Sequence, residues 1–195
     1  MIDFPATPIV GQIFTSGGQS WTWDGMKWVA YGVAQGIYLP LTGGKLTGAL
    51  NPAGGIIGVI DGSDAAPGMV GEVISSVVLG PGVTLVSASG TNITSISLTA
   101  GDWDVQGEVW VAPGTGATLM QGAINTASAG MPVGPTMGVA RTTISATFGT
   151  TGTFLPLSPC RASLAAATTY YLNANVTFSS GTTTAYGKIW ARRVR

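Results

Sequence analysis

After residue 70, short strand-like runs follow one another, and in two of them hydrophobic and polar residues clearly alternate with a period of two. In 102–109 apolar residues alternate with Asp, Gln and Glu, and 171–178 repeats the pattern with Asn and Thr. Such alternation is typical of antiparallel strands with one buried face. Turn residues separate eight or nine such stretches, at 72–79, 83–87, 91–98, 102–111, 117–126, 141–148, 160–165, 169–178 and 183–194. The sequence therefore predicts an all-β fold, with an antiparallel β-sandwich, jelly-roll-like, over residues 71–195.

Residues 1–32 show three shorter strand patterns, at 10–15, 20–24 and 27–31. The dipeptide Asp24-Gly25 is a strong signal for a hairpin turn, so we expect a small N-terminal β-meander. Its tryptophans, Trp21, Trp23 and Trp28, are a large apolar load for a unit that is marginal on its own. Three interpretations remain open: the tryptophans form the core of the meander, a docking surface for another protein, or a platform for sugars.

Residues 33–70 are rich in Gly and Pro and read as a shaft or linker. Glycines at 43, 44 and 48 exclude a stable helix there. The spaced apolar residues nevertheless need burial, which a thin chain obtains by winding around sister chains. The candidate residues for such a shaft are Tyr38, Leu39, Leu41, Leu46 and Leu50.

Three segments resemble bacteriophage fibre proteins. The first is similar to a module of several phage virion proteins and contains Phe4, Pro5, Pro8, Gly11, Phe14 and Thr15, then Trp21, Trp23, Asp24, Gly25 and Trp28. The second, YLPLTGGKLTG at 38–48, is similar to the repeat of tail-fibre shafts. The third, SLTAGDWDV at 97–105 with AYGKIWARRVR at 185–195, is similar to the C-terminal jelly-roll domains of phage fibres.

The resemblance implies a homotrimeric fibre of a bacteriophage virion, assembled in the host cytoplasm. Its N-terminal module would attach it to capsid, neck or tail proteins, with anchoring residues Phe4, Pro5, Pro8, Trp21, Trp23 and Trp28. A single copy of the shaft repeat implies a short fibre. The β-sandwich would point outward and could bind bacterial surface polysaccharide.

Composition agrees with a protein that needs partners. Only 8% of the 195 residues are charged, and eight Lys and Arg balance eight Asp and Glu. A neutral, weakly charged surface promotes association, whereas a basic surface that would bind nucleic acid is absent. The longest apolar runs are too short to insert into a membrane as a helix.

The sequence contains few side chains that could act in catalysis. The chain has no His and one Cys, which excludes Ser-His-Asp or Cys-His catalysis and thiolate or imidazole metal sites. We therefore expect no enzyme activity, no cofactor and no metal. Asp102 and Asp104 flank Trp103 at a spacing that could suit a carboxylate pair, but we expect both to be solvent-facing residues beside a core tryptophan.

Half of the positive charges lie at the C-terminal end, on Lys188, Arg192, Arg193 and Arg195. They are candidates for contact with an acidic sugar or acidic capsid residues. The alternative is a solvated last strand whose charges guard a sheet edge. For the whole chain, a capsid decoration protein or a carbohydrate-binding adhesin module remains the alternative to a fibre.

Overall fold

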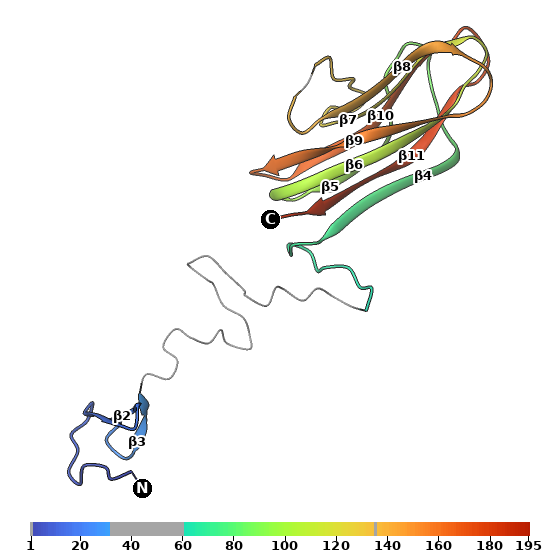
Figure 1. Ribbon diagram of the computed structural model, residues 1–195. Helices are drawn as coiled ribbons and strands as arrows, with labels where there is room; N and C mark the ends of the chain where they lie inside the picture. Colours follow the sequence, from blue (N-terminus) through green and yellow to red (C-terminus); the bar gives the residue numbers. More distant parts are fainter. Residues whose placement is uncertain (1, 32–60, 135) are drawn as a thin grey trace. The chain divides into compact units, whose positions relative to one another are not determined.

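The computed structural model describes residues 2–31, 61–134 and 136–195, and all regular secondary structure within them is β-strand (Figure 1). The chain divides into two compact units, Met1–Ile57 and Gly58–Arg195. We call the described parts of these units the N-terminal module and the C-terminal domain. The expected shaft residues, 38–50, lie outside the described residues.

The N-terminal module is the predicted meander. Its strands are β1 (Ile13–Ser16), β2 (Gln19–Trp23) and β3 (Trp28–Tyr31), which form one antiparallel sheet in that order. The turn between β2 and β3 is closed by the side chain of Asp24. Its Oδ1 accepts the backbone N–H groups of Met26 and Lys27 at 2.8 and 2.9 Å. The hairpin predicted from Asp24-Gly25 is therefore confirmed.

The C-terminal domain is a sandwich of two four-stranded antiparallel sheets, with the order β4-β11-β6-β9 in one and β5-β10-β7-β8 in the other. Counted from the first strand of the domain, these orders are 1-8-3-6 and 2-7-4-5, the arrangement of a jelly roll. The strands are β4 (Val73–Thr84), β5 (Thr91–Leu98), β6 (Gly101–Ala112), β7 (Ala117–Asn125), β8 (Ala140–Phe148), β9 (Thr153–Leu164), β10 (Thr168–Thr177) and β11 (Thr184–Arg193). The predicted separate strand at 83–87 is wrong, because β4 continues through a bulge to Thr84.

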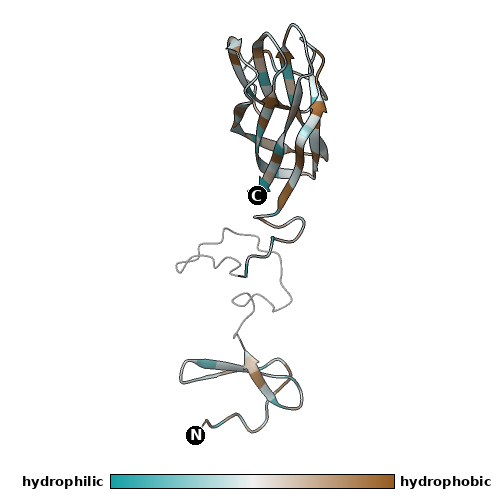
Figure 2. Cartoon of the chain, turned by 90° about the vertical axis from the view of Figure 1, so that its right-hand side faces the viewer, coloured by the Kyte–Doolittle hydropathy of each residue, from teal (hydrophilic) through white to brown (hydrophobic). Residues whose placement is uncertain are grey.

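The core lies between the two sheets, where the inward residues of the strands meet. Figure 2 shows hydrophobic and hydrophilic positions mixed along the strands that enclose it. Trp103, Val105 and Val109 from β6 are fully buried, and so are Leu172 and Val176 from β10. These are the positions that the period-two pattern assigned to the inner face. The alternation in sequence therefore fixes which face of each strand is covered.

Different strands lie at the two edges of the sandwich, and different residue pairs lie at its two ends. Strands β4 and β5 lie together at one edge, and β8 and β9 lie together at the other. Along sheet β4-β11-β6-β9, Val73 pairs with Arg192 at the end where the chain enters and leaves the domain. Tyr186 pairs with Trp110 at the opposite end of the same sheet.

Candidate functional site: association surfaces and the charge clusters that order them

The aromatic residues of the N-terminal module pack on one another. The ring of Phe4 lies 5.2–5.3 Å, between centroids, from the rings of Phe14, Trp21 and Trp28, and Trp23 lies 5.6 Å from Trp28. Four of the predicted anchoring residues thus form the small core of the module. Pro5 and Pro8 are half-buried in the arm that carries Phe4. Anchoring to a particle by these residues stays a prediction.

Other apolar side chains of the module face solvent. Ile9 and Val10 are exposed in the turn before β1, and Met26 is exposed at the tip of the β2–β3 hairpin. The sequence analysis did not single out these residues, because isolated aliphatic residues in turns carry no periodic signal.

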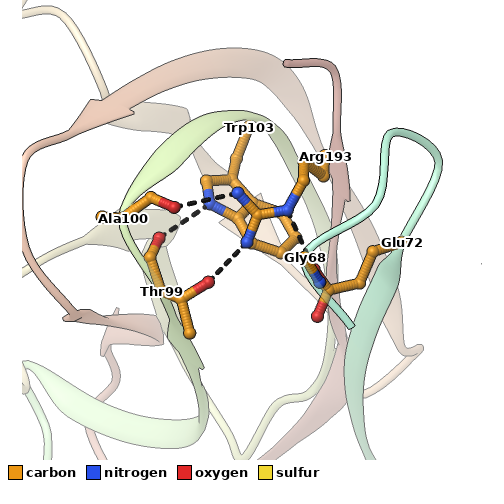
Figure 3. Close-up of polar contacts among 6 residues, drawn as sticks. All are labelled: Gly68, Glu72, Thr99, Ala100, Trp103 and Arg193. Carbon is orange, nitrogen blue, oxygen red and sulfur yellow. Dashed lines mark hydrogen bonds and ion pairs between the residues drawn. The ribbon is translucent and has the colours of Figure 1, made fainter. Parts of the chain in front are cut away.

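A buried guanidinium joins the segment that leads into the C-terminal domain to the last strand of that domain (Figure 3). Arg193 Nε donates to Glu72 Oε2 at 2.9 Å, and both side chains are almost completely buried. The guanidinium also donates to Ala100 O at 2.9 Å and to Thr99 Oγ1. Its Cζ lies 4.2 Å from the ring centroid of Trp103, which is a cation–π contact. One side chain therefore ties together the segment before β4, the β5–β6 turn and the last strand.

The partners of this guanidinium are themselves fixed. The backbone N–H of Gly68 donates to Glu72 Oε2 at 2.8 Å, and Trp103 Nε1 donates to Thr99 O at 3.0 Å. The hydrogen bond from Gly68, and then the contact with Arg193, hold the pKa of Glu72 below its usual value. Gly101 is required here, because a Cβ at its positive φ of 138° would lie 2.0 Å from Arg193 Nη1.

A second charge cluster lies on the outer side of the same end. Asp102 is buried, and its carboxylate accepts two hydrogen bonds from Arg161, at 3.4 and 2.7 Å, and pairs with Arg195. The expectation of a solvent-facing Asp102 is therefore wrong, because two arginines cover it. The hydrogen bonds from Arg161 are the largest cause that lowers the pKa of Asp102 to about 2, and the charge of Arg195 adds to them against the opposing effect of burial.

The predicted basic patch is divided among different roles. Arg193 is buried in its ion pair with Glu72, so it is not available to an outside partner, which corrects that part of the prediction. Arg195 pairs with Asp102, and Lys188 Nζ lies 3.3 Å from Glu108 and 5.1 Å from the ring of Trp190. Arg192 is exposed and makes no ion pair with any residue that the structure describes. The alternation along β11 assigns Arg192 and Arg193 to opposite faces of the strand. It does not show what covers Arg193, the inner of the two.

An aliphatic strip lies along β4, at one edge of the sandwich. Val73, Val77 and Leu79 point outward, and Leu79 is 77% exposed, whereas Ile74 and Val78 pack against the core. β4 contains no charged residue. Natural edge strands usually carry charged residues, bulges or proline to prevent pairing with other chains, and β4 has only its bulge and Pro81 near its far end. The sequence does carry a signal for this strip, because β4 is apolar on both of its alternating faces.

Three aromatic rings cluster at the end of the sheet opposite the chain entry. Trp110 pairs with Tyr186 on one side and with Phe154 on the other. The Trp110 and Tyr186 rings are within 7° of parallel with centroids 6.3 Å apart, and Phe154 lies 5.1 Å from Trp110. Trp110 and Phe154 are 40% and 39% exposed. We call these three residues the aromatic trio.

Residues 2–31, 61–134 and 136–195 contain no group of three His, Cys, Asp or Glu side chains that could hold a metal ion. Within the same ranges, no helix is long and apolar enough to cross a membrane.

Comparisons with known proteins find structures of virus particles, and their similarity to this chain is low. No protein-family model matches the chain, and no curated protein matches it. A structure of infectious bursal disease virus, Gx strain, aligns with 12% identity and a TM-score of 0.44, over 69% of this chain and 37% of that one. The VP2 subviral particle of the same virus aligns with 16% identity and a TM-score of 0.38, over 63% of this chain and 30% of that one. The Gt strain structure has 18% identity and a TM-score of 0.33, over 61% and 30%.

The chain thus spans about a third of the length of these viral chains. The strand order of the two sheets is that of a jelly roll.

Replacing Arg193 tests the buried ion pair. Arg193→Met should lower the free energy of unfolding of the C-terminal domain by about 3–5 kcal/mol, because Glu72 is left buried without its partner. Arg192→Met, at the exposed neighbouring position, should change it by less than about 0.5 kcal/mol. Denaturant unfolding followed by tryptophan fluorescence measures both. Equal losses for the two variants would contradict the assigned role.

The lowered pKa of Asp102 predicts a loss of stability in acid. A carboxylate whose pKa falls from 3.8 to about 2 on folding stabilises the folded state fully above pH 3.8, and this contribution is lost as the pH falls toward 2. The unfolding free energy of the native chain should therefore fall with decreasing pH across that window. The unfolding free energy of the Asp102→Asn variant should fall less steeply, because Glu72 is then the only one of the two buried carboxylates that titrates. Parallel pH profiles for the two proteins would refute the assignment.

Proposed function

We propose that the chain is a structural protein of a bacteriophage particle, a short homotrimeric fibre without enzymatic activity. The N-terminal module attaches it to other virion proteins, and the jelly-roll domain forms its outward head. The observation that carries the proposal is the aliphatic strip of Val73, Val77 and Leu79 on an edge strand without charged residues. A surface of this kind is costly to leave in water and favours burial against another chain.

Three further features support a fibre. The chain has a separate small unit in front of its main domain, and the sequence between them contains the single shaft-type repeat. The low content of charge makes association with copies of the same chain favourable. The jelly roll supplies a rigid body on which association surfaces are held in place.

Native mass tests the trimer directly. Light scattering of the purified full chain should give three times the 19.7 kDa of one chain. Leu39→Ser combined with Leu41→Ser should raise the concentration at which the trimer half-dissociates by at least about tenfold, since two apolar side chains then no longer gain from burial. The mass of a single chain for the unmodified protein would exclude the fibre and favour a decoration protein that assembles only on its capsid.

The aromatic trio favours a second function for the same head, binding of bacterial surface polysaccharide. Exposed aromatic rings beside polar side chains are typical of sites that combine apolar contact with a few hydrogen bonds. Trp110, Phe154 and Tyr186 lie at the end of the domain opposite the chain entry, where a receptor would be met first. A carbohydrate-binding adhesin without a fibre role would rest on this feature alone.

Binding to host cells or their purified polysaccharide tests this function. Trp110→Ala should weaken binding by about tenfold or more, the loss expected when a central aromatic contact is removed. Trp190→Ala, on the same sheet face beneath Lys188, is the matched control and should leave binding unchanged. Equal binding by the unmodified protein and Trp110→Ala would exclude the trio as the receptor site.

A further inference from the structure

An ion pair lies directly beside the aromatic trio on the outer face of its sheet. Glu108 and Trp110 are two residues apart along β6, and Lys188 and Tyr186 are two residues apart along β11. Residues two apart on a strand share a face, and these four are on the face that points away from the core. Trp110 pairs with Tyr186, and Glu108 pairs with Lys188, in the register of the two strands. The four residues therefore form two neighbouring rows, one aromatic and one charged.

The two charges of the second row balance each other. Lys188 Nζ lies 3.3 Å from Glu108 Oε1, and the side chains are 46% and 28% exposed, so a ligand can reach both. An ammonium has three donors and a carboxylate accepts through two oxygens, so their mutual contact leaves hydrogen-bonding capacity on each group. The row thus offers a donor and an acceptor side by side with no net charge.

In the described part of the C-terminal domain, this is the one charged pair at the end of the sheet that carries the trio. The loops at the same end contain no charged residue; they are 85–90, 113–116, 149–152 and 178–183. The next charged residues on the same face of β6 and β11 are Asp104 and Arg192, which again pair with each other in register. An acidic ligand at the trio would therefore find no unmatched cation beside it.

A neutral sugar ring fits this combination of rows. Its C–H face is apolar and packs on an aromatic ring, and the hydroxyl groups at its edge both donate and accept hydrogen bonds. We propose that the aromatic trio and the Lys188–Glu108 pair form one binding site for a neutral sugar of a bacterial surface polysaccharide. The ring packs on Trp110, one hydroxyl donates to Glu108, and a neighbouring hydroxyl accepts from Lys188.

The same ion pair disfavours acidic sugars. A carboxylate on the ligand would have to displace Glu108 from Lys188, which would bring two carboxylates close together. The pairing with Glu108 therefore argues against an acidic sugar at Lys188. This inference rests on the proposed binding of polysaccharide and names the class of sugar that the site takes.

An array of purified neutral and acidic bacterial polysaccharides, probed with the full chain, tests the class of sugar. The glycans that bind should be neutral. Raising the ionic strength should change their binding by less than about twofold, because no net charge of the ligand is matched by the site.

Removing one charge of the pair tests its role. Glu108→Gln keeps the shape of the side chain and leaves Lys188 without its partner. At low ionic strength this variant should bind polygalacturonate, an acidic polymer, about tenfold or more tightly than the unmodified chain does, and the gain should disappear at high ionic strength. Asp104→Asn is the matched control, because it removes a carboxylate from the same face of β6, opposite Arg192, and should leave the binding of polygalacturonate unchanged.

The outcomes separate the inference from the function on which it rests. Acidic glycans bound as well as neutral ones by the unmodified chain would overturn the inference, while binding of polysaccharide would stand. Equal binding of polygalacturonate by Glu108→Gln and Asp104→Asn would also overturn it, because the ion pair would then not set the preference. An array on which no glycan binds would instead reject the proposed binding of polysaccharide, and the inference with it.

Discussion

The jelly roll closes only when its first and last strands pair, and the Glu72–Arg193 ion pair lies where they do. These residues are 121 positions apart in sequence, so their contact links the two ends of the chain segment that forms the domain. The same guanidinium covers Trp103, the largest of the fully buried core side chains, and holds the β5–β6 turn. A buried charge is tolerated only when its hydrogen bonds are made, so this end of the domain is fixed in one arrangement.

Charged residues are concentrated at one end of the C-terminal domain. Arg193, Arg161 and Arg195 all bind the buried carboxylates of Glu72 and Asp102. Five of the sixteen charged residues of the chain therefore take part in ion pairs at one end of the sandwich. Strand β4 itself has no charged residue, and a monomer would leave its outward Val73, Val77 and Leu79 in water.

The pattern of the sequence predicted the architecture well, because it depends on which face each residue occupies. Alternation placed Trp103 and Leu172 inside and gave the meander and the sandwich. It failed for Asp102, Arg193 and Asn173, which are buried although their strands or composition suggest exposure. Each is covered by a segment distant in sequence: the C-terminal residues, the segment before β4, and the β7–β8 loop. No periodicity within a strand reports such coverage.

The placement of these features gives the domain a direction. Both buried ion clusters lie at the end where the chain enters and leaves, and the aromatic trio lies at the other end of the same sheet. The proposed association through the β4 strip uses neither end, so it is compatible with attachment at one and recognition at the other. In the proposed trimer, three identical tips would bind a repetitive polysaccharide by several weak contacts at once, and the effective concentration set by the trimer would then matter more than the affinity of one site.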